Sequence, residues 1–155
     1  MRVGTGRVVY QWIENWAKMP NTEDAQAAWA HPGIVATEAG EIITTHQDGS
    51  SLLLFDREGG LRRWWKIGLV EAHGITLVKE GDTYYLWIAD NGSKRHPQHG
   101  YEYPPGSDKV SGQVVKMTLD GQTVLRLEKP PLPIYSYTRY APTSVAVNEE
   151  RLGGN

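Results

Sequence analysis

The sequence predicts an all-β protein assembled from four-stranded antiparallel units. A turn followed by a short apolar strand occurs at residues 31–36 and returns at 72–77 and at 141–147. Behind the first two copies come further short segments rich in β-branched and aromatic residues, separated by turns that contain Gly, Asp or Asn. Recurrence of this kind is the signature of a repeat architecture.

The spacing of the repeat fits one blade of a β-propeller. Gly33 and Gly74 occupy matching positions 41 residues apart, within the window of about 40–45 residues for a four-stranded blade. Gly74 and Ser144 are 70 residues apart. Two segments rich in Pro, Gly and Tyr, at 93–111 and 128–140, explain the excess as loops. We therefore expect a single partial β-propeller domain over residues 1–155, with about two antiparallel blades plus extra strands.

Each predicted blade has its strands in sequence order. Blade one spans residues 31–71, with strands expected at 31–36, 40–45, 51–56 and 61–65. Blade two spans residues 72–130 and carries the inserted loop at 93–111. Its strands are expected at 72–77, 82–90, 113–119 and 123–127.

The two ends of the chain are expected to lie outside the complete blades. Residues 1–30 should contain a strand at 7–12 and a short helix at 22–30 with Asn21 as N-cap. Residues 131–155 should contain a loop and the first strand of a third blade. Since propellers have about 4–8 blades, this length predicts a fragment of a six-bladed ring whose N-terminal strand pairs with the last blade.

An alternative is a short chain of which three copies close the ring. In either case the open strand edges predict self-association of the chain.

Composition excludes several classes of function. Lys and Arg total 16 and Asp and Glu total 18, a net charge of -2, so we expect neither a nucleic-acid partner nor a membrane surface. The absence of Cys excludes a disulfide scaffold, a thiolate metal site and a cysteine nucleophile. Residues 1–10 lack the apolar run of a signal peptide, which predicts a soluble, cytoplasmic protein.

Three motifs of the second blade carry a family resemblance. They are His-Gly-Ile at 73–75, Leu-Trp-Ile-Ala-Asp at 86–90 and Gln-Val-Val-Lys at 113–116. With them, residues 31–147 resemble the NHL-repeat propellers, and most of all the branch that contains the peptidyl-hydroxyglycine alpha-amidating lyases. One fold hosts many functions, so the resemblance predicts architecture more strongly than reaction.

The resemblance implies a zinc ion held by three histidines and a calcium ion held partly by backbone carbonyls, with no organic cofactor. His73 matches the first zinc histidine, and Ile34 and Ile75 match positions that lend carbonyls to calcium. Independently of the resemblance, a histidine that begins an innermost strand faces the channel, where it either ligates zinc or forms a structural hydrogen bond. The other two zinc ligands would have to come from residues that this chain lacks.

One departure from the family leaves the enzymatic activity open. The lyases carry an arginine after a histidine where this chain has His46 and Gln47, and an amide lacks the permanent charge of guanidinium. We therefore expect a ligand-binding or interaction scaffold, with a metal-dependent lyase as the alternative. The chain alone is expected to be inactive.

Loop residues are the candidates for ligand contact. Rings and a guanidinium on these loops can stack on a sugar or peptide, so we expect a small-molecule or peptide ligand. Structural roles are the alternative. Asp90 would then belong to an ordinary turn, and the residues of the second loop would pack on a neighbouring blade. The candidates are Asp90, Tyr101, Tyr103, Tyr135, Tyr137 and Arg139.

Overall fold

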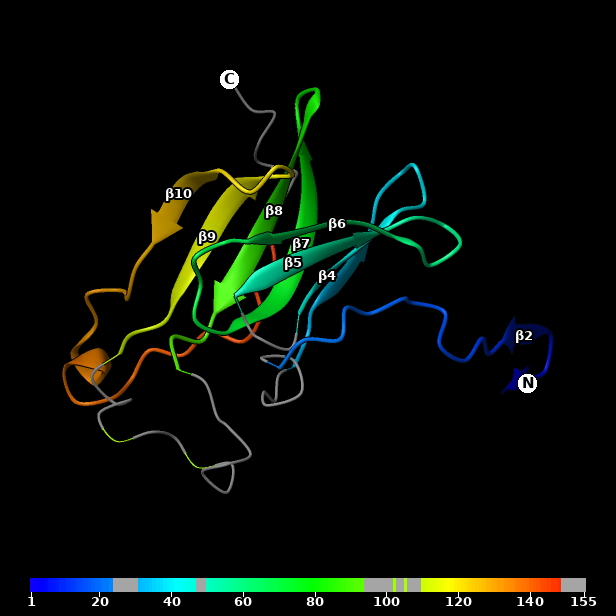
Figure 1. Cartoon of the computed structure of the whole chain (residues 1–155). Coiled ribbons are helices and arrows are strands. Elements are labelled where there is room, and N and C mark those ends of the chain that lie inside the picture. Colours follow the sequence, from blue (N-terminus) through cyan, green and yellow to red (C-terminus); the bar gives the residue numbers. More distant parts are fainter. Residues whose placement is uncertain (24–30, 47–49, 94–101, 103–104, 106–109, 149–155) are drawn as a thin grey trace.

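The structure is all-β and contains two antiparallel four-stranded sheets. It is a computed structural model that describes residues 1–23, 31–46, 50–93, 102, 105 and 110–148. Figure 1 shows the two twisted sheets packed beside each other and an N-terminal hairpin that extends away from them. The predicted fold class is confirmed. The predicted helix at 22–30 falls mostly outside the described residues.

The first sheet matches the predicted first blade. Its strands are paired in sequence order, each antiparallel to the next. They are β3 (Ile34–Ala36), β4 (Ile42–Thr45), β5 (Ser51–Phe55) and β6 (Leu61–Lys66).

The second sheet matches the predicted second blade and has the same order of strands. Its first two strands form the long hairpin seen in Figure 1, whose turn contains Gly81 with a φ of 61°, a conformation that glycine adopts without strain. The strands are β7 (Ala72–Glu80), β8 (Thr83–Asp90), β9 (Gln113–Thr118) and β10 (Thr123–Leu127).

The hydrophobic core lies between the two sheets. Alternate side chains of a strand point to the same face, and register brings Leu86, Ile88 and their neighbours on β9 onto one face of the second sheet. Each fully buried aliphatic side chain contributes about 1.5–3 kcal/mol. The core cluster comprises Ile43, Leu52, Ile67, Leu69, Ala72, Leu86, Ile88, Val115 and Met117.

Successive repeats approach each other closely where their first strands begin. A Cβ atom on Gly33 would lie 2.5 Å from the His73 carbonyl oxygen and 2.7 Å from the Ile75 nitrogen. A Cβ atom on Gly74 would lie 2.7 Å from the Thr143 carbonyl oxygen. Thr143 precedes Ser144 as His73 precedes Gly74, so each repeat packs on the next in the same register. This is the packing expected of successive blades in a partial propeller.

The strand predicted at 7–12 was expected to pair with the last blade of the ring, and the structure gives it a different partner. Residues 8–11 form β2 (Val8–Gln11), but β2 pairs with a strand that the sequence did not reveal, β1 (Arg2–Thr5). Gly6 has a φ of 63° and lets the chain reverse within two residues. The strand therefore finds a partner within its own hairpin.

The predicted first strand of a third blade does not form within residues 141–148, which have no regular secondary structure. This segment nevertheless lies beside β7, because the Thr76 hydroxyl donates a hydrogen bond of 2.6 Å to the Val145 carbonyl. A strand requires a ladder of backbone bonds, and here the bond comes from a side chain. The preceding segment, predicted as a loop, contains a short 3-10 helix, η3 (Pro133–Ser136).

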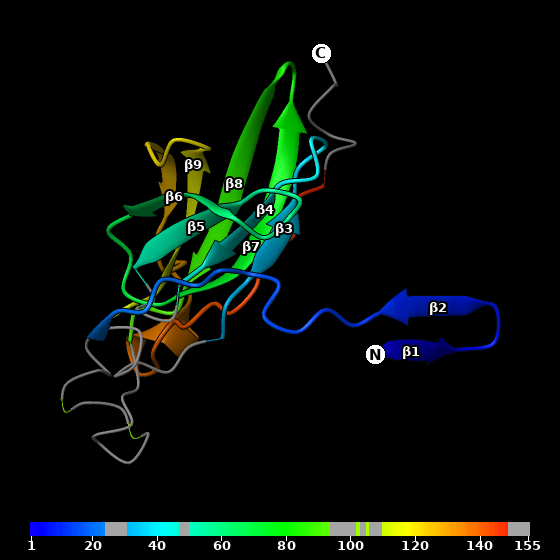
Figure 2. The same ribbon diagram turned by 45° about the vertical axis from the view of Figure 1, so that its right-hand side comes forward.

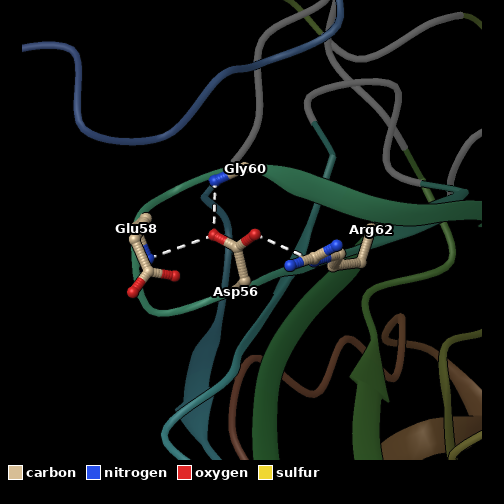
Figure 3. A network of polar contacts seen from close by, with 4 residues as sticks. All are labelled: Asp56, Glu58, Gly60 and Arg62. Carbon is tan, nitrogen blue, oxygen red and sulfur yellow. Dashed lines mark hydrogen bonds and ion pairs between the residues drawn. The ribbon is translucent and has the colours of Figure 1, made fainter.

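Asp56 holds the turn between β5 and β6 (Figure 3). Its carboxylate accepts hydrogen bonds from the backbone amides of Gly60 at 2.7 Å and Glu58 at 3.0 Å. Arg62 forms an ion pair with it at 2.8 Å. The bond from Gly60 is the main reason that the pKa of Asp56 lies below its ordinary value of 3.8, while desolvation acts in the opposite direction.

We predict that Asp56→Asn reduces the acid sensitivity of the fold. Because the pKa of Asp56 is lower in the folded chain, its charge stabilises the fold above about pH 4, and this stabilisation is lost as the pH falls through the folded-state pKa. Urea unfolding at about pH 7 and about pH 3 measures the change. Asp82→Asn, at an exposed turn position, is the control. Equal pH dependence in the wild type and Asp56→Asn would contradict the expectation.

Candidate functional site

Two imidazole rings meet near the starts of β3 and β7, the first strands of the two sheets. His31 and His73 are stacked, with ring centroids 4.9 Å apart and an interplanar angle of 29°. The close approach at Gly33 produces this contact, because Gly33 lies against the His73 carbonyl. The sequence predicted His73 as a site residue but not His31. The signal was present, since a histidine stands directly before the Pro-Gly of the first repeat and directly before Gly74 in the second.

The surroundings of His73 favour its neutral form. Partial burial lowers the pKa of His73 from the ordinary 6.5, and the charge of His31 lowers this pKa further. A hydrogen bond to the Thr143 backbone acts in the opposite direction. Neutral imidazole is the form that accepts a proton or ligates a metal.

The described residues supply an incomplete donor set for zinc. Within them, no three His, Cys, Asp or Glu side chains lie close enough together to hold a metal ion, whereas a catalytic zinc takes three protein ligands. His31 and His73 are the two such side chains that meet at this point of the described structure. The predicted calcium positions, Ile34 and Ile75, lie on the adjacent strands β3 and β7, and each pairs with the second strand of its own sheet.

His46, the histidine at the predicted departure from the family pattern, is fully buried. Its ring packs on Trp64 at a centroid distance of 5.5 Å. Gln47 lies outside the described residues.

Asp90 performs a structural task. It is 1% exposed and accepts hydrogen bonds from the backbone amides of Glu71 at 2.9 Å and Gly92 at 3.1 Å. The Gln113 side-chain amide donates a further bond to it at 3.0 Å. This carboxylate joins the segment before β7 to the end of β8, in keeping with the turn interpretation.

The three predicted binding residues on the loop after β10 have different surroundings. Arg139 donates a hydrogen bond of 2.9 Å to the side-chain oxygen of Asn91. The rings of Tyr135 and Tyr140 meet edge to face, 5.2 Å apart. Tyr137 is 79% exposed and is thus presented to solvent. Tyr101 and Tyr103, the candidates on the inserted loop, lie outside the described residues.

Two hollows adjoin at this end of the second sheet. One of about 470 Å³ is formed by the loop itself, and one of about 350 Å³ lies between the loop and the start of β9. Both volumes fall in the range of small-ligand sites, about 300–1,000 Å³. The first is lined by Lys129, Pro130, Pro131, Leu132, Pro133, Tyr135 and Ser136, and the second by Ser111, Gly112, Gln113, Glu128 and Lys129.

Lys129 belongs to both hollows and closes the loop around the first. Its ammonium group donates a hydrogen bond of 3.0 Å to the Tyr135 carbonyl. In the second hollow, Gln113 is held from two sides, because it donates to Asp90 and accepts a bond of 2.8 Å from Arg126. The two hollows thus combine apolar walls with a few fixed polar groups, an arrangement suited to binding.

Comparison with family models, curated proteins and solved structures found no match to this chain. Among the residues that the structure describes, there is no helix of the length and apolarity needed to cross a membrane. The functional argument therefore rests on the site itself.

We predict that His73 makes the fold sensitive to mild acid. Since its pKa is lower in the folded chain than the ordinary 6.5, protonation favours unfolding as the pH falls below that value. The free energy of unfolding of the wild type should decrease between about pH 7.5 and pH 5.5, and less so for His73→Gln. His31→Gln should reduce the pH dependence in part, because it removes the second cause of the shift. Chemical denaturation at both pH values measures this, and identical slopes for the wild type and His73→Gln would contradict it.

Proposed function

We propose that this chain is part of an NHL-type β-propeller that acts as a ligand-binding or interaction scaffold. The observation that carries the proposal is the pair of adjoining hollows around Lys129, between the loop after β10 and the start of β9. In repeat proteins of this kind, the rigid sheets position loops, and the loops make the contacts.

The loop is held in place at several points, which supports a site that is formed before a ligand arrives. Arg139 anchors it to Asn91, and the Gly112 amide donates a hydrogen bond of 2.7 Å to the Tyr140 carbonyl. Lys129 closes its other end on Tyr135. A loop that is already ordered loses less conformational entropy on binding, and a larger share of the contact energy appears as affinity.

The chemistry of the walls favours a small molecule or a short peptide with an apolar portion and at least one polar group. Prolines and Tyr135 form an apolar surface in the larger hollow. Glu128, Lys129 and Gln113 offer one negative, one positive and one neutral hydrogen-bonding group in the smaller hollow. Tyr137, two positions after Tyr135, is exposed to solvent.

We predict that ligands of this site will depend on Tyr135 and Lys129. A library of short peptides and small polar-aromatic compounds is screened by thermal shift, since a ligand at about 100 times its Kd stabilises the fold by about 2.7 kcal/mol. Tyr135→Ala and Lys129→Ala should each weaken the binding of the hits at least about tenfold in calorimetry. Lys79→Ala, an exposed lysine on β7, is the matched control. Hits that bind all three variants equally would contradict the proposal.

A second candidate is a metal-dependent lyase similar to the alpha-amidating lyases. It is supported by the His31 and His73 pair and by the lowered pKa of His73, which keeps a nitrogen lone pair available. When bound in such a site, zinc activates water or a substrate alkoxide. The described residues supply only part of a ligand set, with His73 as the proposed zinc ligand and Ile34 and Ile75 as the proposed carbonyl ligands of calcium.

We predict for this second candidate that zinc content depends on His73. Elemental analysis of the purified protein compares the wild type, His73→Ala and His46→Ala. Loss of zinc in His73→Ala with retention in His46→Ala, whose imidazole is buried against Trp64, supports the lyase candidate. Unchanged zinc in His73→Ala removes His73 as a ligand.

A further inference from the structure

The N-terminal hairpin has one apolar face, and this face is in solvent. Register pairs Val3 with Tyr10 and Thr5 with Val8, so these four side chains share one face. Every residue of β1 and β2 is exposed, and Figure 2 shows the hairpin clear of both sheets. The apolar face is continued by Met1 and Trp12, which a backbone hydrogen bond of 2.7 Å joins.

A hairpin of this kind needs a partner. An isolated two-stranded hairpin is marginally stable in water, and a third strand or a packed face is required for stability. Exposed apolar surface that is gathered on one face marks an interaction site more often than scattered exposed residues do. The opposite face is formed by Arg2, Gly4, Val9 and Gln11, so the two faces differ in chemistry.

The same chain has an open strand edge, β10, on which a further strand can pair. This strand is the outermost of the second sheet, and in the described part of the chain its outer edge has no neighbouring strand. All five of its residues are exposed, and Leu125 and Leu127 are 42% and 46% exposed. An edge of this kind presents free backbone N–H and C=O groups to any strand that aligns with it. The two strands are similar in length, since β10 has five residues and β2 has four.

The hairpin is tethered away from the β10 edge of its own chain. Trp16 packs on Phe55 of the first sheet with ring centroids 6.3 Å apart, and the Lys18 amide bonds the Gly59 carbonyl at 2.9 Å. Trp16 lies five positions after Gln11, and an extended chain spans at most about 3.6 Å per position, about 18 Å in total. Figures 1 and 2 show the hairpin and β10 on opposite sides of the molecule.

We infer that the β1–β2 hairpin of one copy docks on the β10 edge of a second copy. A strand of the hairpin pairs through its backbone with β10 of the neighbouring copy and so extends the second sheet of that copy. The apolar face of the hairpin then lies beside Leu125 and Leu127. Donor and acceptor are different surfaces, so the contact is head to tail, and successive copies form either a closed ring or an open chain. This assembly is independent of the ligand site proposed above.

The first test compares the two faces of the hairpin. Sedimentation velocity of the full chain over a dilution series should show reversible association, which Val8→Asp weakens at least about tenfold because a charge replaces a buried aliphatic group. Val9→Asp is a closely matched control. Val9 is 58% exposed and Val8 is 54% exposed, but they lie on opposite faces of the same strand. A monomeric wild type, or equal weakening by both variants, overturns the inference in favour of another occupant of the hairpin.

The second test distinguishes head-to-tail docking from pairing of two hairpins. Leu127→Asp disrupts the β10 edge and leaves the hairpin intact. Val8→Asp disrupts the hairpin face and leaves the β10 edge intact. Each variant alone should be monomeric, and an equimolar mixture should form a one-to-one heterodimer. A mixture that stays monomeric overturns the inference. Leu125→Asp is a second acceptor variant, and circular dichroism confirms that the substituted, exposed positions leave the sheets folded.

Discussion

The close contact between the starts of successive repeats is the constraint on which the rest of the structure depends. Gly33 lies against the backbone of His73 and Ile75, and Gly74 lies against the backbone of Thr143. This contact sets how near the two sheets can come and allows the aliphatic residues between them to exclude water. It also stacks His31 on His73. The core and the histidine pair therefore share one geometric cause.

Two groups of different chemistry lie at the same end of the second sheet, where Ala72 at the start of β7 pairs with Asp90 at the end of β8. Where β7 begins, the surroundings of the half-buried His73 lower its pKa and favour its neutral form. Where β8 ends, the buried Asp90 organises the backbone around Gly92 and holds Gln113. The loop after β10 then folds over this end and creates the two hollows. Asp90 is thus an indirect determinant of the proposed binding site, since it positions Gln113 within one wall.

All eight strands of the two sheets could be predicted from the sequence, because strand periodicity, turn residues and the 41-residue spacing are local signals. The pairing of β1 with β2 was missed, since β1 is short and contains a glycine. The third-blade strand was predicted from its resemblance to the other repeats, but a strand also needs a neighbour to pair with. The contact of Arg139 with Asn91 joins residues 48 positions apart, and no periodicity in the sequence encodes it. The contact of His31 with His73 was missed although the repeat places a histidine at the start of both units.

The close packing of the repeats can be measured most directly by adding a methyl group at each glycine contact. Gly33→Ala and Gly74→Ala place a Cβ atom within 2.5 Å and 2.7 Å of backbone atoms that cannot rotate away, so each should lower the free energy of unfolding by about 1–3 kcal/mol. Ser144→Ala, at the matching and exposed position of the next repeat, should change it by no more than about 0.5 kcal/mol. Unfolding in urea gives all three values. Wild-type stability in both glycine variants would contradict the repeat-on-repeat packing.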